Sequence, residues 1–157
     1  MELDPQWEYV SDGVMGGLST GSLTRAQVAG RQAMRLMGDV SLDNNGGFVQ
    51  MAFDLRPDGG AFDASRWDAI ALDVCGNAQA YDLRLRTDQL TRPWQSFRAD
   101  FVAQPQWRTI TIPFAEMEAH RTDATFGPAR LRRVGVLGIG RVFRVDVAVS
   151  AVRLVRT

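Results

Sequence analysis

Frequent turn residues divide this chain into short apolar segments, and this division limits the folds open to it. Seven segments are rich in β-branched and aromatic residues, which is typical of strands. The stretches between them, such as DNNGG and RPDGGAFD, contain the glycine, proline and Asx residues that supply turn conformations. The pattern predicts an all-β chain folded as a sandwich or barrel. The seven segments are residues 46–55, 67–76, 79–87, 94–102, 107–114, 131–139 and 142–156.

Two further segments need a decision between helix and strand. Residues 24–37, TRAQVAGRQAMRLM, contain an N-cap candidate and good helix formers, so local propensity favours a helix. We expect a hairpin that turns at Ala29 and Gly30 instead, because the strands elsewhere need partners. One short helix is expected in PFAEMEAH, residues 113–120, where Pro113 lies near the start and acidic residues follow in the first turns.

The length and composition are those of an ordinary globular protein. The chain has 157 residues, of which 45% are apolar and 23% charged, and this predicts a single domain, residues 1–157, with a sizeable core. No apolar run approaches the length that spans a bilayer. The start, MELDPQWEY, lacks the basic residues and the apolar stretch of a signal peptide. We therefore expect a cytoplasmic protein without a membrane span.

The charge balance disfavours two classes of partner. Eighteen basic and eighteen acidic residues leave a formal net charge of zero, so nothing global favours nucleic acid or an acidic membrane surface. The eighteen basic residues are all arginine, and the absence of lysine removes Schiff-base chemistry. Arginine is permanently charged and planar, which suits recognition better than proton transfer.

Cysteine and histidine occur once each, which excludes disulfide frameworks and zinc sites built from Cys and His. Cys75 closes the apolar run AIALDVC, and a buried structural thiol is the better interpretation. His120 lies in the charged stretch AEMEAHRTDATFG, where we expect a solvated side chain rather than a catalytic base. No cofactor is predicted.

Two glycine-rich runs do not match phosphate-binding loops. In SDGVMGGLSTG, residues 11–21, the spacing of Gly13, Gly16 and Gly17 fits neither the dinucleotide nor the nucleotide-triphosphate pattern. The run GVLGIGR, residues 135–141, leads into a strand-like segment rather than a helix. A buried strand that contains glycine is the better interpretation of this second run.

Several segments together resemble one protein family. They are WEYVSDGVMGGLSTG, GDVSLDNNGGFVQM, YDLRLRT, SFRADF, WRTITIPF and FRVDVAVSAVRLV, and in this order they resemble the complex I intermediate-associated protein family over nearly the whole chain. The resemblance implies a galactose-binding-like jelly-roll β-sandwich, akin to carbohydrate-binding modules. Eukaryotic members of that family act as chaperone-like factors in the assembly of respiratory complex I, so the resemblance also implies a protein-binding or assembly role.

Within the implied fold, the glycine-rich runs are expected to form a structural signature. Their glycines would permit tight turns, and the polar residues would hydrogen-bond nearby backbone groups. The alternative is a calcium site at the rim of the sandwich, for which Asp12, Asp39, Asp43 and Asn44 could supply oxygen ligands. The signature comprises Asp12, Gly13, Met15, Gly16, Gly17, Ser19, Asn44, Asn45, Gly46 and Gly47.

Strand alternation predicts a candidate binding face. In AYDLRLRT the apolar set Tyr81, Leu83 and Leu85 should face the core, which sends the intervening residues outward. The same phase in WQSFRADF sends Phe97, Ala99 and Phe101 inward. If the two strands are neighbours, their outward residues form one arginine-rich patch beside a tryptophan. The predicted face comprises Arg84, Arg86, Trp94, Arg98, Asp82 and Asp100, with Asp73 and Gln50 as possible extensions.

Such a face suits recognition, because arginine forks pair with carboxylates or phosphates and tryptophan stacks on sugars or anchors protein interfaces. A solvated face of cross-strand ion pairs is the alternative. We predict a non-catalytic module that binds a protein partner, with a carbohydrate or small anion as the alternative ligand. A glycosidase that uses Asp82 and Asp100 is disfavoured, since neighbouring arginines favour ionised carboxylates. The remaining tryptophans, Trp7, Trp67 and Trp107, should pack at the sandwich edge.

Overall fold

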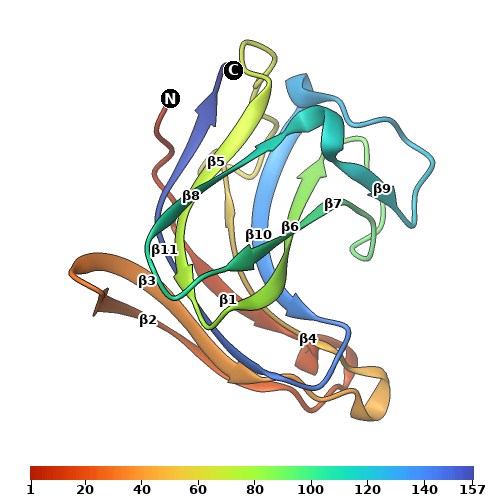
Figure 1. The fold of residues 1–157 in the computed structure, drawn as a ribbon. Coiled ribbons are helices and arrows are strands. Elements are labelled where there is room, and N and C mark those ends of the chain that lie inside the picture. The colour runs from red at the N-terminus through yellow and green to blue at the C-terminus, as the bar shows by residue number, and fades with distance from the viewer.

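The computed structural model describes all 157 residues as two antiparallel sheets that pack face to face (Figure 1). The first sheet has six strands in the order β1-β4-β10-β6-β7-β9, and the second has five in the order β2-β3-β11-β5-β8. The all-β jelly-roll prediction is confirmed. The strands are β1 (Glu8–Ser11), β2 (Thr20–Val28), β3 (Arg31–Asp39), β4 (Phe48–Asp54), β5 (Ala69–Gly76), β6 (Gln79–Thr87), β7 (Ser96–Ala103), β8 (Arg108–Pro113), β9 (Glu118–His120), β10 (Leu131–Ile139) and β11 (Arg144–Val155).

A core of 27 buried residues fills the space between the sheets. The alternation predicted for β6 is confirmed, since Tyr81, Leu83 and Leu85 are all almost fully buried. Burial raises the pKa of Tyr81 to about 12, because a low dielectric disfavours the phenolate. The Tyr81 hydroxyl donates to Asn77 Oδ1 at 2.6 Å and accepts from the backbone N–H of Asp146 at 2.9 Å. Tyr81 therefore joins β6 of one sheet to β11 of the other.

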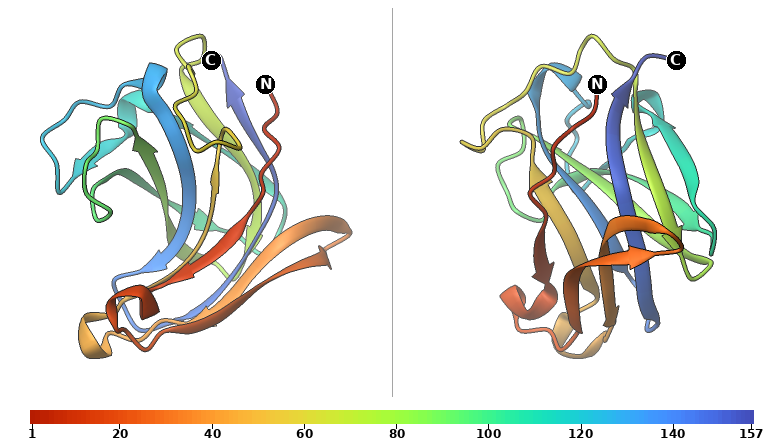
Figure 2. Two further views of the ribbon diagram at one scale, coloured as in Figure 1. Left: turned by 180° about the vertical axis from the view of Figure 1, so that it is seen from behind. Right: turned by 90° about the vertical axis from the view of Figure 1, so that its left-hand side faces the viewer.

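The hairpin expected at residues 24–37 is confirmed. Strands β2 and β3 pair over nine residues, and the chain turns at Ala29 and Gly30, which have φ angles of 44° and 85°. Two positive φ angles are typical of the tight turn that matches strand twist. Figure 2 shows the hairpin extending beyond the rest of its sheet. Pairing with β11 on the other side of β3 outweighs the helix propensity of this segment.

The short helix predicted at residues 113–120 is wrong in its length and in its second half. Only one 3-10 turn forms there, η3 (Phe114–Glu116), and the chain then extends into β9, which pairs with β7. Phe114 and Met117 are both buried in the core, so packing ends the helix after one turn. The other 3-10 turns are η1 (Asp12–Met15), η2 (Asp43–Asn45) and η4 (Pro128–Arg130). None of the helical segments is long or apolar enough to cross a membrane.

The remaining predictions about buried elements agree with the structure. The run 135–141 begins in β10, where Gly135 and Gly138 are buried. Cys75 is buried, and burial raises the pKa of its thiol. The three tryptophans pack at the sandwich edge: Trp7 lies edge-on to Phe53, Trp67 stacks on Phe62, and the Trp107 indole N–H donates to the carbonyl of Val28 at 2.8 Å.

Candidate functional site

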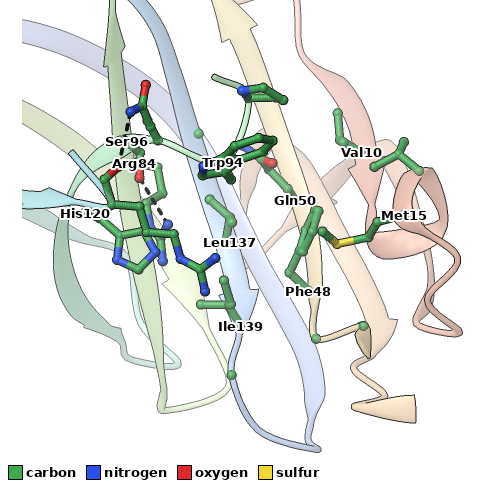
Figure 3. Close-up of a pocket in the computed structure, with 18 of the residues that line it drawn as sticks. Val10, Met15, Phe48, Gln50, Arg84, Trp94, Ser96, His120, Leu137 and Ile139 are labelled. Atoms are coloured by element: carbon green, nitrogen blue, oxygen red, sulfur yellow. Dashed lines mark hydrogen bonds between the residues drawn. The ribbon is translucent and has the colours of Figure 1, made fainter. Parts of the chain in front are cut away.

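A groove of about 890 Å³ lies on the face of the six-stranded sheet that points away from the core. We call this face the groove face. Strands β4, β10 and β6 supply the floor, and the loops after β1, before β4 and before β7 supply the walls. Figure 3 shows Trp94 above the floor, with His120 and Arg84 at one end and Val10 and Met15 at the other.

The register of the strands sets the order of side chains across the floor. Val10 of β1 lies opposite Gln50 of β4, which lies opposite Leu137 of β10, and Leu137 in turn lies opposite Asp82 of β6. Alternate residues of paired strands share one face, so these side chains form a row across the sheet. The row runs from apolar at β1 to charged at β6, which divides the groove into an apolar end and a charged end.

The apolar end exposes large side chains to solvent. Val14 is 80% exposed, Met15 58% and Leu42 48%, and Phe48 lies on the floor beside Met15. With Trp94, the groove contains four of the eight large apolar side chains that are exposed in this chain. Scattered exposed apolar residues need no explanation, but a concentration of them in one hollow is typical of an interaction site.

A buried carboxylate holds the walls of the apolar end. Asp12 is fully buried and accepts hydrogen bonds from the backbone N–H groups of Ser19 (3.0 Å), Gly47 (2.6 Å) and Phe48 (3.2 Å), and from the Ser19 hydroxyl. Burial by itself raises the pKa of Asp12, but the Ser19 hydroxyl and the backbone donors together lower it. Asp12 therefore ties the loop after β1 to the loop before β4.

Two glycines of the signature runs are required by close approach to this carboxylate. A Cβ atom on Gly17 would lie 2.4 Å from Cγ of Asp12, and one on Gly46 would lie 2.5 Å from Oδ2. Gly16 has a φ of 87°, which is readily adopted only by glycine. The side chains of Asn44 and Asn45 make no hydrogen bond to the backbone, and both residues contribute left-handed backbone instead, with φ of 55° and 58°.

The alternative calcium site does not fit these loops. Asp12 already has four protein donors on its oxygens, and Asp39 pairs with Arg144 at 3.0 Å. Asp43 is exposed, and no three acidic, histidine or cysteine side chains come together in this chain.

At the charged end, part of the predicted arginine patch is paired internally. Asp82 is only 6% exposed and accepts hydrogen bonds from Arg84 at 2.8 and 3.0 Å and from Arg98 at 3.2 Å. Arg84 also donates to the Ser96 hydroxyl at 3.1 Å. Asp100 lies opposite Asp82 and is exposed. Because Arg84 and Arg98 both bind the Asp82 carboxylate, Asp82 and Asp100 are not arranged as the free acid and base of a glycosidase.

Arg86 points outward as alternation predicted, but one end of its guanidinium is engaged by the chain itself. One of its terminal nitrogens, Nη1, donates to the carbonyls of Arg92 (3.1 Å), Pro93 (2.9 Å) and Gln95 (2.6 Å). No carboxylate contacts it, and burial, with neighbouring arginines, lowers the pKa of Arg86. These hydrogen bonds hold the loop that carries Trp94 over the groove, so Arg86 positions Trp94.

The two proposed extensions of the patch separate in space. Gln50 lies on the floor, and its amide makes no hydrogen bond within the chain. It lies over Gly135, where a Cβ would be 2.3 Å from Gln50 Nε2. Asp73 does not join this face, which corrects the expectation. It belongs to β5 of the five-stranded sheet, where it pairs with Arg153 and Thr109, because the consecutive strands β5 and β6 enter different sheets.

The charged end contains two residues that sequence reasoning missed. His120, expected to be solvated, lies half-buried on β9 opposite Ser96 and lines the groove. Burial lowers the pKa of His120, and Arg84, Arg121 and Arg98 lower it further. Arg121 follows with a φ of 57° and also lines the groove. A three-residue strand is too short for periodicity to reveal, so no sequence signal was available.

A known protein family matches most of this chain. The sequence matches the family model described as Complex I intermediate-associated protein 30 (CIA30) over residues 2–143. The chain therefore belongs to the CIA30 family. The matched range contains both loops tied by Asp12 and all the strands of the groove face. No curated protein sequence matches this CIA30 chain.

Several solved structures with the same fold are carbohydrate-binding modules. A family 11 module of a cellulosomal cellulase of Clostridium thermocellum superposes with a TM-score of 0.79 at 16% identity, covering 100% of this chain and 94% of the module. The same family's module in complex with a β-1,3-1,4-mixed-linked tetrasaccharide gives 0.77 at 16%, covering 99% and 95%. A family 30 module from Clostridium thermocellum gives 0.67 at 14%, covering 98% and 95%. At these identities the likeness establishes the fold.

Proposed function

We propose that this CIA30 chain is a non-catalytic binding module that holds an extended segment of a protein partner in the groove. The observation that carries the proposal is the meeting of exposed apolar side chains with unpaired polar groups in one hollow. Val14, Met15 and Trp94 offer apolar contact area, and Gln50 and Arg121 offer hydrogen-bonding groups that no residue of the chain occupies. Buried anchors beside polar groups are the usual composition of a protein interface.

The apolar end favours a protein over a sugar as the occupant. Its exposed surface consists of aliphatic and thioether side chains, Val14, Met15 and Leu42, which adapt to apolar side chains. Sugar rings are bound by stacking on flat aromatic faces, and Trp94 is the one aromatic side chain that stands well exposed in the groove. The family description, which names an association with a complex I intermediate, supports a protein as the occupant.

The chemistry of the groove supports binding rather than catalysis. Asp82 is occupied by Arg84 and Arg98, and Cys75 is buried on the five-stranded sheet, away from the groove. A nucleophile needs an adjacent base within hydrogen-bond reach. The single histidine, His120, makes no hydrogen bond to a serine, threonine or cysteine side chain, so no such pair is present.

A carbohydrate is the second candidate, and one observation favours it. Trp94 and the open amide of Gln50 line the same groove, and together they could stack on one sugar ring and hydrogen-bond its hydroxyls. The similar family 11 module was solved with a mixed-linked tetrasaccharide. This candidate requires that a single aromatic platform be enough for affinity.

The test is a peptide-display selection on the full chain, run beside calorimetry with the mixed-linked tetrasaccharide. Val14→Gln changes an 80% exposed residue in the groove, and Val142→Gln makes the same change at a 71% exposed residue outside it. We expect selected peptides to lose about tenfold in affinity to Val14→Gln and to bind Val142→Gln as they bind the wild type. Peptides that bind Val14→Gln undiminished would contradict the proposal. Tetrasaccharide binding that Trp94→Ala abolishes, without any selected peptide, would support the second candidate.

A further inference from the structure

A second hollow, of about 450 Å³, continues the groove beyond its charged end. It shares Arg84, His120 and Arg121 with the groove. Four arginines and two aspartates line it, an excess of two positive charges. Because the whole chain has no net charge, this excess is a local property of the groove face.

The pairing of these charges leaves one arginine open. Arg84 and Arg98 share the single carboxylate of Asp82. Arg141 donates to the Gln79 side chain and the Ala80 carbonyl, which are neutral acceptors. The guanidinium of Arg121 contacts no carboxylate and donates to no residue of the chain, although it lines both hollows.

The backbone and neighbours of Arg121 hold it at this place. Its carbonyl accepts a hydrogen bond from Gln95 Nε2 at 3.2 Å, which links it to the loop of Trp94. Its φ of 57° is a conformation that residues with a Cβ rarely adopt. The turn places Arg121 directly after β9, beside the half-buried His120.

The groups that face His120 come from three elements. Arg84 and Asp82 belong to β6 and Arg98 belongs to β7, while Arg121 follows β9 itself. The positive charges outnumber the negative ones around the imidazole. An anion that enters here therefore meets arginine donors and reduces the repulsion among the cations.

We propose that this end of the groove binds a carboxylate of the partner segment, with Arg121 as its main donor. The inference rests on the proposed function and names the chemistry of one end of the bound segment. The planar fork of arginine matches the two oxygens of a carboxylate, and a protein segment supplies carboxylates from Asp and Glu side chains and from its C-terminus.

His120 provides the readout, because it is the one histidine in the chain and gives one Cε1–H signal by NMR. The probes are acetyl-Leu-Glu-amide, its neutral isostere acetyl-Leu-Gln-amide, and acetyl-Leu-Gln with a free C-terminus. Acetyl-Leu-Glu-amide should raise the pKa of His120 by about one unit, since a nearby opposite charge favours the imidazolium. The neutral isostere should leave it unchanged, and the third probe shows whether a C-terminal carboxylate serves as well as a side chain.

Arg121→Gln should weaken binding of the acidic probe about tenfold, and Arg121→Lys, which keeps the charge, should lose less. Arg108→Gln is the matched control, because Arg108 is exposed on the other sheet and its loss should change nothing. An equal response to the neutral isostere, or full affinity in Arg121→Gln, would overturn the inference. Selected peptides that bind the groove with neutral residues at this end would overturn the carboxylate site and leave the proposed function standing. A response of His120 to the acidic probe, without any selected peptide, would support the carboxylate site and contradict the proposed function.

Discussion

Arginines and other polar side chains lie both on the outer face of the five-stranded sheet and on the groove face of the six-stranded sheet. They differ in whether they are paired within the chain. On the outer face, Arg35 donates to both oxygens of Asp146 at 2.8 and 2.7 Å, and Arg153 to both oxygens of Asp73 at 2.9 and 3.0 Å. The Thr109 hydroxyl also donates to Asp73. On the groove face, the side chains of Gln50, His120 and Arg121 make no hydrogen bond within the chain.

This difference shows that an arginine-rich strand is not by itself a sign of binding. Cross-strand ion pairs such as Arg35–Asp146 satisfy the sheet that contains them and are worth little beyond that. The groove face also contains such ion pairs, which join Asp82 to Arg84 and Arg98. What distinguishes the groove is the presence of open donors beside exposed apolar side chains.

The largest effect is expected at the carboxylate that supports the groove walls. Asp12→Asn should lower the free energy of unfolding by about 3 kcal/mol, because in either orientation the amide nitrogen would face a buried N–H donor, that of Ser19 at one oxygen position or that of Gly47 at the other. Urea denaturation measures this. Asp43→Asn, an exposed change in the neighbouring loop, should stay within about 0.5 kcal/mol. Similar losses in the two variants would show that the walls do not depend on Asp12.

The same carboxylate makes the walls sensitive to acid. The pKa of Asp12 is lowered below its ordinary value of 3.8 in the folded chain, so the unfolded chain binds the proton first as the pH falls. The stabilisation is complete above the ordinary value and is lost as the pH falls through the folded pKa. The difference in stability between wild type and Asp12→Asn should therefore shrink in acid.

A smaller loss is expected when the loop above the groove is released. Arg86→Met removes three hydrogen bonds to the carbonyls of residues 92–95 and should cost about 1 to 2 kcal/mol of stability. Trp94 should become mobile, which fluorescence anisotropy would report in a background where Trp7, Trp67 and Trp107 are replaced by phenylalanine. Anisotropy equal to that of the wild type would show that other contacts hold this loop.

The aromatic over the groove should affect binding more than folding. Trp94 is 54% exposed, so Trp94→Ala should change the free energy of unfolding by less than about 0.5 kcal/mol. Affinity for a selected peptide should fall about tenfold, as is typical for an aromatic anchor. Calorimetry on both proteins separates the two effects. Unchanged affinity would remove Trp94 from the site.

On the outer face the expected effect is on stability alone and is small. Asp146→Asn breaks the pair with Arg35, in which both side chains are about one-third exposed, and should cost less than about 1 kcal/mol. Peptide affinity should equal that of the wild type. A loss of affinity here would break the contrast between the two faces.

The smallest effect is the pH dependence at His120. Its pKa is lowered below 6.5, first by burial and then by the nearby arginines, so the unfolded chain binds a proton at higher pH than the folded chain. Stability should therefore decrease as the pH falls from about 6.5 towards the folded pKa. His120→Gln cannot titrate, and its melting temperature should decrease less than that of the wild type between about pH 7.5 and about pH 5.5. Equal decreases would show that His120 is not in this environment.

Local patterns predicted much of the fold. The alternation in residues 79–87 placed Tyr81, Leu83 and Leu85 in the core, and the turn at Ala29 and Gly30 was expected from the need for strand partners. The first result depends on neighbouring residues in the chain, because side chains alternate with a period of two. The second went against the local helix propensity of residues 24–37. The family resemblance, carried by the glycine-rich runs, predicted the sandwich.

The site needed the tertiary structure. Asp73 and Asp82 lie on consecutive strands with similar outward phase, yet they face opposite sides of the molecule because β5 and β6 join different sheets. Alternation shows that Arg86 points outward from its strand, but not that the loop at 92–95 returns to occupy it. His120 lies in the groove because it belongs to the short strand β9, which pairs with β7.

The sequence by itself thus determined most of the strands, their inward faces and the family resemblance, since these follow from periods and motifs that are local in the chain. Only the tertiary structure decided which strands share a sheet and which polar groups remain open. The reason is physical: whether an arginine is paired or free depends on residues far away in the sequence, as with Arg35 and Asp146, which are 111 positions apart.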